Sequence, residues 1–274
     1  KNIDLESSVD WESAKGIEGL NLPSAMDRYA QYEGLELLPL TDLDWVIPAP
    51  QKQIFKGAYR TPSDLNISIE DLKMDLDFIQ TRLQEELQIK VDTNKKFQSN
   101  VLITQNKTLD PEGYKLSILD ESIQIEAAAA VGAFYALESL HQILLIAQNE
   151  EKGWPLLKIE DKPRFHNRGF MGDVARNFYP KEKIFQILDY MALYKLNRFD
   201  LKLTDDDGWR IEIPGLPELT EVGSNRGYTT DENDRLIPMY GSGSGDQKST
   251  GSGFLSGQDF VEILNYAKKR NIEV

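Results

Sequence analysis

Residues 168–222 read RGFMGDVARNFYPKEKIFQILDYMALYKLNRFDLKLTDDDGWRIEIPGLPELTEV and decide the fold of this chain. An apolar strand at 169–171 is followed by the polar residues Asp173 and Arg176, and a helix that starts with proline is expected over 180–195. A second strand over 198–203 then ends in the polar run TDDDGWR. Strand, helix, strand, with chemistry after the carboxyl end of each strand, is how a (β/α)8 barrel begins.

This stretch also resembles one family closely. The matching pieces are RG (168–169), DVARNF (173–178), MALYKLN (191–197) and LTDDDGWRIEIPGLPELTEVG (203–223, with residue 207 variable). They resemble the opening of the catalytic barrel of the family 20 glycoside hydrolases, the β-N-acetylhexosaminidases, and within them the bacterial chitobiases. A chance match of this length is very improbable.

The chain ends at Val274, where a third strand is expected to begin. Residues 164–274 are fewer than half of the roughly 250 that such a barrel needs, and the chain begins at Lys1 without an initiator methionine. We therefore expect a fragment cut at both ends, with the first two to three barrel strands only. The resemblance places the family's catalytic Asp-Glu pair on a later strand, in a Gly-Gly-Asp-Glu type motif that is absent here. No catalytic residue is assigned, and the pair is expected beyond Val274.

The fold class expected is α/β: an N-terminal α+β domain followed by a truncated (β/α)8 TIM barrel. Residues 1–43 are acidic and weakly patterned, and they are interpreted as a linker or the tail of an upstream domain, with a disordered leader as the alternative. Residues 44–160 are assigned to a non-catalytic α/β domain and residues 161–274 to the barrel.

Periodicity supports the N-terminal domain. Apolar spacing predicts a helix from Leu72 to Leu87 and a largely buried helix over 128–148. Alternation predicts strands at 65–69 and 101–104 and a hairpin of 114–119 with 122–127. This β-α-β-β-α order resembles the domain that precedes the barrel in family 20. Residues 157–165 are interpreted as a strand that links the two domains.

Composition limits the possible partners. The net charge of −14 opposes binding to nucleic acid or an anionic membrane, so a neutral or cationic small molecule fits better. The most apolar stretch, 127–147, is interrupted by Glu138, His141 and Gln142, so no membrane span is expected. There is no cysteine, which excludes disulfides and thiolate ligands.

The candidate substrate-binding residues follow the two strands. A guanidinium at Arg176 can hold two sugar hydroxyls through fixed donors, and the resemblance implies that it binds the non-reducing-end sugar. The alternative is an ion pair with Asp173 or Asp205. Asp205 and Asp206 cannot both face the same way along a strand, so one is expected in the site while the other braces a loop. The resemblance places them in a polar network, and a solvated acidic turn is the alternative.

Trp209 and Tyr240 are further candidates for sugar contact. For Trp209 the alternative is that its ring packs against the rim of the barrel. Tyr240 lies in the long loop 223–253, which has the Pro-x-Tyr-Gly element of chitobiases. His141 and His166 are not expected to act in catalysis. The spacing of Asp205–Asp207 does not follow a calcium loop, so no metal and no cofactor are assigned.

One departure from the family concerns the second strand. Where the family has His-x-His, this chain has Asp200 and Lys202, which share one face of the strand. We expect the two charges to pair inside the barrel, because burying either one alone is costly. Asp207, where chitobiases often have Glu or Gln, is a milder change.

The function that the resemblance implies is removal of terminal N-acetylglucosamine from chitobiose or short chito-oligosaccharides. It implies substrate-assisted hydrolysis with retention and a periplasmic or secreted location. A sugar-binding pseudoenzyme and a lacto-N-biosidase-like member are the alternatives. The former is motivated by Asp200 and Lys202, and the latter by the loop 223–253.

Overall fold

The structure is a computed structural model that describes residues 24–35, 43–93, 99–228, 235–239, 241–243 and 249–274. Contacts divide the chain into two units, Lys1–Leu43 and Asp44–Val274. Among its described residues the first unit has a helix that was not expected from the sequence, α1 (Ala25–Tyr32). Ser24 caps it through a capping box with Asp27, but none of its residues is buried. The role of residues 1–43 as a linker or tail stays a prediction.

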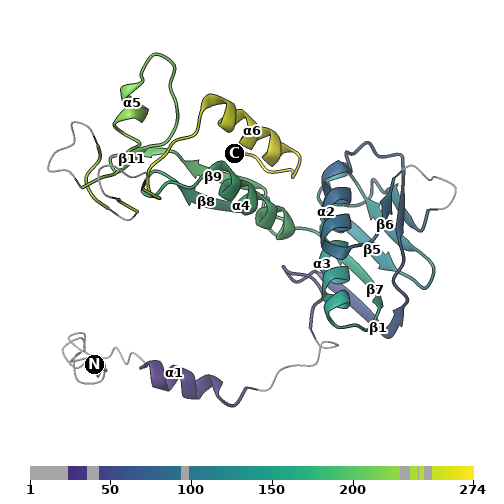
Figure 1. The fold of residues 1–274 in the computed structure, drawn as a ribbon. Helices are drawn as coiled ribbons and strands as arrows, with labels where there is room; N and C mark the ends of the chain where they lie inside the picture. The colour runs from purple at the N-terminus through teal and green to yellow at the C-terminus, as the bar shows by residue number, and fades with distance from the viewer. Residues whose placement is uncertain (1–23, 36–42, 94–98, 229–234, 240, 244–248) are drawn as a thin grey trace. The chain divides into compact units, whose positions relative to one another are not determined.

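The second unit begins with a mixed sheet of seven strands in the order β1-β7-β5-β6-β4-β2-β3 (Figure 1). Three neighbouring pairs are parallel: β3 with β2, β2 with β4 and β4 with β6. The other three pairs, β6 with β5, β5 with β7 and β7 with β1, are antiparallel. The bounds are β1 (Lys52–Arg60), β2 (Leu65–Glu70), β3 (Val91–Asp92), β4 (Val101–Gln105), β5 (Tyr114–Ile118), β6 (Ile123–Ala127) and β7 (Trp154–Asp161). The helices are α2 (Asp77–Leu87) and α3 (Ala130–Asn149), and α3 packs on β5, β6, β7 and α2.

Most of the predicted elements of this domain are confirmed, and two predictions need correction. The hairpin of β5 and β6 pairs Ile118 with Ile123, as the alternation requires. Helix α2 begins at Asp77, so Leu72 precedes it. The supposed linking strand is β7, which lies between β1 and β5 within the sheet and ends at Asp161. Its first four residues are buried, so it contributes to the core of this domain rather than bridging to the next.

Helix α3 is long and apolar enough to span a membrane by length and composition. In the structure 78% of its most apolar window is buried against the rest of the protein. The burial of Phe134, Leu137 and Leu140 against the sheet is the environment of a core helix.

The remaining residues form a β-α-β unit. Its parts are β8 (Gly169–Asp173), α4 (Lys181–Leu193) and β9 (Arg198–Lys202). The two strands are parallel, from Gly169 opposite Arg198 to Asp173 opposite Lys202, as predicted. Next to β9 on its other side, Glu273 forms a parallel bridge with Arg198. The third strand expected at the end of the chain therefore starts beside the second.

After β9 the chain makes a tight hairpin of β10 (Thr204–Asp205) with β11 (Gly208–Trp209), a short helix α5 (Glu218–Glu221), and then α6 (Gly257–Lys268). Helix α6 has a capping box of Ser256 and Asp259 and packs with α4 over the two strands (Figure 1). The buried members of this core are Val174, Ile184, Leu188, Met191, Phe199, Leu255, Ile263, Ala267 and Ile272.

A buried lysine connects the turn before β9 to the seven-stranded sheet. Lys195 has a positive φ of 59° and its Nζ lies 2.9 Å from the Tyr114 hydroxyl and 3.2 Å from Asp161 Oδ2. Burial lowers the pKa of Lys195, and the Asp161 carboxylate opposes that shift. The turn that feeds β9 is thus held by the sheet that precedes the barrel.

The two capping boxes make a matched test of what holds α6. S256A removes the acceptor for the Asp259 N–H and should lower the free energy of unfolding by about 1 kcal/mol, because α6 covers the barrel core. S24A removes the same interaction from α1, which has no buried residue, and should leave the cooperative transition unchanged. Urea unfolding followed by tryptophan fluorescence measures both. An equal loss from the two variants would contradict the assignment of α6 to the core.

Candidate functional site

The carboxyl ends of β8 and β9 bring one arginine and three carboxylates together. Arg176 Nη1 lies 3.3 Å from Asp173 Oδ2, and its Nε lies 3.8 Å from Asp205 Oδ2 and 3.7 Å from Asp207 Oδ2. Within residues 1–274 the Arg176 side chain is 63% exposed. Arg176 thus forms ion pairs with Asp173 and Asp205, which the sequence analysis gave as the alternative to sugar contact. Sugar contact by Arg176 stays a prediction.

The hairpin explains how two residues of the acidic run reach the same arginine. Thr204 pairs with Trp209 and Asp205 with Gly208, which leaves Asp206 and Asp207 as the two-residue turn. The Asp207 N–H donates to Asp205 Oδ1 at 2.8 Å, a side-chain-to-backbone bond typical of such turns. Asp207, which the sequence analysis treated as a mild substitution, therefore joins the cluster.

Lys202 provides the closest positive charge to this cluster. Its Nζ donates to Asp205 Oδ2 at 2.5 Å and lies 3.4 Å from Asp173 Oδ2. Burial would raise the pKa of Asp205, but the hydrogen bonds from Lys202 and the Asp207 N–H, and the charge of Arg176, lower it on balance. The same contact with Asp205 raises the pKa of Lys202. Asp205 and Lys202 therefore stay charged over the physiological range.

The expected pair of Asp200 with Lys202 is wrong. Both alternate with Phe199, which is buried toward the helices, so they share the face of β9 away from that core. Lys202 nevertheless pairs with Asp205 and Asp173, whose carboxylates lie at the ends of the strands, and not with Asp200. Asp200 is exposed, and among the described residues it has no ion pair.

The remaining candidate residues differ in their surroundings. Asp206 is exposed at the tip of the hairpin, whereas Asp205 binds Lys202, so the two carboxylates have different surroundings although their oxygens lie within 4.8 Å of each other. Among the described residues Asp206 makes no contact that braces a loop, as had been expected of one of the two. Trp209 is partly buried and its indole N–H donates to Ile211 O at 2.7 Å, so that group is used within the chain. Tyr240 lies outside the described residues. Sugar contact by Trp209 or Tyr240 stays a prediction.

The acidic run has the composition of a cation site, with ligand oxygens of Asp205, Asp206 and Asp207 within 4.8 Å of one another. Lys202 and Arg176 already supply positive charge to Asp205 and Asp207. A metal is therefore not required to balance these carboxylates.

Two arginines beyond the strand ends were missed. Arg210 and Arg226 are 0% and 1% exposed, respectively, and both bind main-chain carbonyls around the cluster. Arg210 belongs to the motif TDDDGWR, but nothing in the sequence pattern distinguishes Arg226 from a solvated loop residue. A buried arginine inside an irregular loop becomes recognisable only once the loop path is known.

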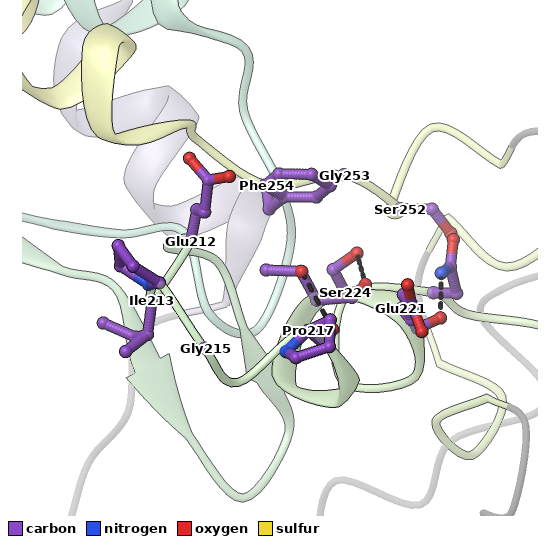
Figure 2. A pocket seen from close by; sticks show the side chains of 12 residues that line it. Glu212, Ile213, Gly215, Pro217, Glu221, Ser224, Ser252, Gly253 and Phe254 are labelled. Carbon is purple, nitrogen blue, oxygen red and sulfur yellow. Dashed lines mark hydrogen bonds between the residues drawn. The ribbon is translucent and has the colours of Figure 1, made fainter.

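A hollow of about 680 Å³ lies between the segments that follow β11 and precede α6, and no residue of the Arg176 cluster lines it (Figure 2). Its polar side chains mostly bond to its own backbone: Thr220 to Pro217 O at 3.1 Å, Ser224 to Thr220 O at 2.6 Å and Asn225 to Glu221 O at 2.6 Å. Few donors remain free for a ligand. The hollow is therefore a weaker candidate for a sugar site than the open Arg176 cluster.

The two histidines lie away from this cluster. His141 is buried on α3 with Nε2 2.9 Å from Glu86, and burial lowers its pKa to about 4. On the same helix, burial raises the pKa of Glu138 to about 7 although Arg82 binds it at 3.1 Å. His166 is 88% exposed ahead of β8. Neither histidine is placed to act on a ligand at Arg176.

A mixed sheet domain followed by a β-α-β unit with polar residues at the carboxyl ends of its strands places the chain among α/β proteins. Comparison with protein families narrows this class. Residues 45–162 match the model of "Glycosyl hydrolase family 20, domain 2" and residues 165–274 match that of "Glycosyl hydrolase family 20, catalytic domain". The chain belongs to glycosyl hydrolase family 20.

Individual relatives agree with this assignment. The N,N'-diacetylchitobiase of Vibrio harveyi is 53% identical over 161 residues, 59% of this chain and 18% of that protein. The β-hexosaminidase of Vibrio vulnificus is 34% identical over 254 residues, 92% of this chain and 29% of that protein. The chain thus spans less than a third of each of these relatives.

Solved structures are similar as well. The GH20 exo-β-N-acetylglucosaminidase from Vibrio harveyi in complex with N-acetylglucosamine has 30% identity and a TM-score of 0.72, over 86% of this chain and 36% of that one. A mutant β-hexosaminidase from Streptomyces plicatus in complex with N-acetylglucosamine has 28% identity and a TM-score of 0.65, over 86% of this chain and 46% of that one.

The contact between Lys202 and Asp205 has a pH signature. In K202M the pKa of the Asp205 carboxyl should rise, because its nearest cation is gone, and carbon-13 NMR titration of that carboxyl measures the change. A depressed folded-state pKa stabilises the protein above the unfolded value of about 3.9, and the effect is lost as pH falls through the folded value. The wild type should therefore be more stable than K202M at pH 7, with a smaller difference near pH 3.

K183M is the matched control for this experiment, because Lys183 is an exposed lysine of α4 whose amine bonds only Gln186 among the described residues. It should leave the Asp205 titration unchanged. An unchanged Asp205 pKa in K202M would show that Lys202 is not the partner that holds it.

Proposed function

We propose that this chain is part of a β-N-acetylhexosaminidase that removes terminal N-acetylglucosamine from chitobiose or short chito-oligosaccharides. The observation that carries the proposal is the exposed Arg176 guanidinium among three carboxylates at the carboxyl ends of β8 and β9. Active sites of such barrels lie at this face. Family membership and the names of the relatives support the reaction and the sugar.

In this proposal Arg176 donates from its planar fork to hydroxyls of the non-reducing-end sugar. Asp205 and Lys202 form the polar base beside it, and their opposite charges keep both side chains in fixed positions. Asp206, at the tip of the hairpin, and Trp209 and Tyr240 are further candidates for contact. None of these groups is positioned as the acid for the scissile bond.

The chemical step proposed is substrate-assisted hydrolysis with retention. The 2-acetamido oxygen of the sugar attacks the anomeric carbon, a glutamic acid protonates the leaving oxygen, and an aspartate orients the acetamido group. Family 20 is one of the exceptions to the scheme with two catalytic carboxylates. We propose that both carboxylates lie beyond Val274, and that no cofactor takes part. A periplasmic or secreted location would suit such substrates.

A sugar-binding pseudoenzyme is the second candidate. The replacement of the family's histidine pair on this strand by Asp200 and Lys202 supports it, and Lys202 pairs with Asp205 instead of Asp200. An enzyme and a binder differ in turnover, whereas both should bind N-acetylglucosamine. A lacto-N-biosidase-like member would differ in releasing a disaccharide instead of a single sugar.

The proposal predicts different outcomes for two polypeptides. Residues 1–274 alone should not hydrolyse a chromogenic N-acetylglucosaminide, whereas the longest natural polypeptide that contains them should. Binding without transition-state stabilisation does not raise turnover. Assays at equal concentration measure the difference. Comparable turnover by residues 1–274 would contradict the placement of the acid, and inactivity of both would favour the pseudoenzyme.

A substitution at Arg176 tests its role directly in the longer polypeptide. R176M should lower kcat/KM by about 10- to 150-fold, which corresponds to the roughly 1.5–3 kcal/mol of hydrogen bonds that involve a charged group. R198M is the matched control, because Arg198 lies at the opposite end of β9 and pairs with Glu273 at 3.1 Å. Full activity of R176M would exclude Arg176 from the sugar site.

A further inference from the structure

Arg210 and Arg226 are unusual because they are buried without a carboxylate in contact. Both are almost fully buried, and among the described residues neither has an ion pair within 4.0 Å. Burying a guanidinium is costly unless its donors are satisfied. Main-chain carbonyls satisfy most of these donors, and the charges of Asp205 and Asp207 attract the two arginines at longer range.

The carbonyls that they bind are neighbours in the loop after β8. Arg210 Nε donates to Ala175 O at 3.1 Å, and Arg226 Nη2 donates to Arg176 O at 2.8 Å. The same Nη2 donates to Asp207 O at 2.5 Å, in the turn of the acidic hairpin. Arg226 thus links the backbone of Arg176 to the backbone of the acidic run.

The other donors of the pair extend into the long loop. Arg210 Nη1 donates to Ser224 O at 2.7 Å and lies 3.3 Å from Gly253 O. The Arg226 N–H donates to Ser252 Oγ at 2.8 Å. Residues from the beginning and the end of the loop 223–253 are therefore connected to the loop that carries Arg176.

Arg176 itself depends on its backbone for orientation. Its N–H donates to Asp173 Oδ1 at 3.1 Å and its carbonyl accepts from Arg226, so both peptide groups of the residue are held. Its guanidinium has only the longer contacts of 3.3 to 3.8 Å with carboxylates. The direction in which the side chain leaves the loop is consequently set by the main chain.

We propose that Arg226, assisted by Arg210, is a positioning residue that fixes the backbone of Arg176 and thereby aims its guanidinium at the sugar. The inference rests on the proposed function, in which Arg176 is the group that holds the sugar. Arginine suits this role because the two hydrogens of Nη2 lie in fixed directions in the guanidinium plane, toward the carbonyls of Arg176 and Asp207, and the group keeps its charge when buried. A lysine ammonium also has several donors, but they rotate freely at the end of four flexible carbons, so their directions are not fixed.

The test is a double-mutant cycle of R226M and R176M in the longest natural polypeptide that contains this chain. The substrate is a chromogenic N-acetylglucosaminide, and Kd for N-acetylglucosamine is measured in parallel by calorimetry. In the wild-type background R226M should lower kcat/KM and weaken sugar binding about tenfold or more. In the R176M background it should change either quantity less than about twofold, because the group that it positions is already gone.

Two further variants control for folding. R226K should retain the fold and the charge but lose the two-carbonyl geometry, so it should behave like R226M rather than like the wild type. R198M, at the opposite end of β9, should leave both quantities unchanged. If R226M does not fold, R226K is used in the same cycle.

The outcomes separate this inference from the proposed function. If the R226 variants lower kcat/KM and sugar binding equally in both backgrounds, Arg226 has a structural role only. If they lower neither quantity in either background, Arg226 does not act on the site. A wild type that binds N-acetylglucosamine without hydrolysing it would contradict the proposed reaction, while the cycle on Kd would still test the positioning. A wild type that neither binds nor hydrolyses the sugar would overturn both.

Discussion

The parallel pairing of β8 with β9 is the interaction on which the rest of this site depends. It places Asp173 directly opposite Lys202, so the polar residues that follow each strand meet at one edge. The pairing is maintained by the apolar layer beneath α4 and α6, in which Phe199 is buried. Without that layer, Arg176 and the acidic hairpin would be separate loops with no common site.

Charge balance at this edge comes from both exposed and buried groups. Asp173, Asp205 and Asp207 surround Arg176, and Lys202 binds Asp205 directly. The two buried arginines contribute positive potential without occupying the carboxylate oxygens. A protein with a net charge of −14 can therefore keep an acidic cluster ordered while leaving one guanidinium open to solvent.

Elements with a strong apolar period were predictable, whereas side-chain partners were not. Helices α3 and α4, the hairpin of β5 with β6 and the strands β8 and β9 follow from apolar periodicity, the proline that starts α4 and the motif TDDDGWR. The partner of Lys202 was wrong because a shared strand face does not specify which of several carboxylates is nearest. The role of Arg226 was invisible because its contacts are carbonyls, which every residue carries.

Recognition of carbonyls by Arg210 and Arg226 has an evolutionary consequence. A bond to a main-chain oxygen does not depend on the side chain of the residue that provides it. Exposed positions such as Ile237, whose carbonyl lies 3.4 Å from Arg226 Nη1, can therefore change identity while the path of the loop is retained. The side chains on the exposed side of this loop can therefore vary without loss of the bonds that hold the backbone of Arg176.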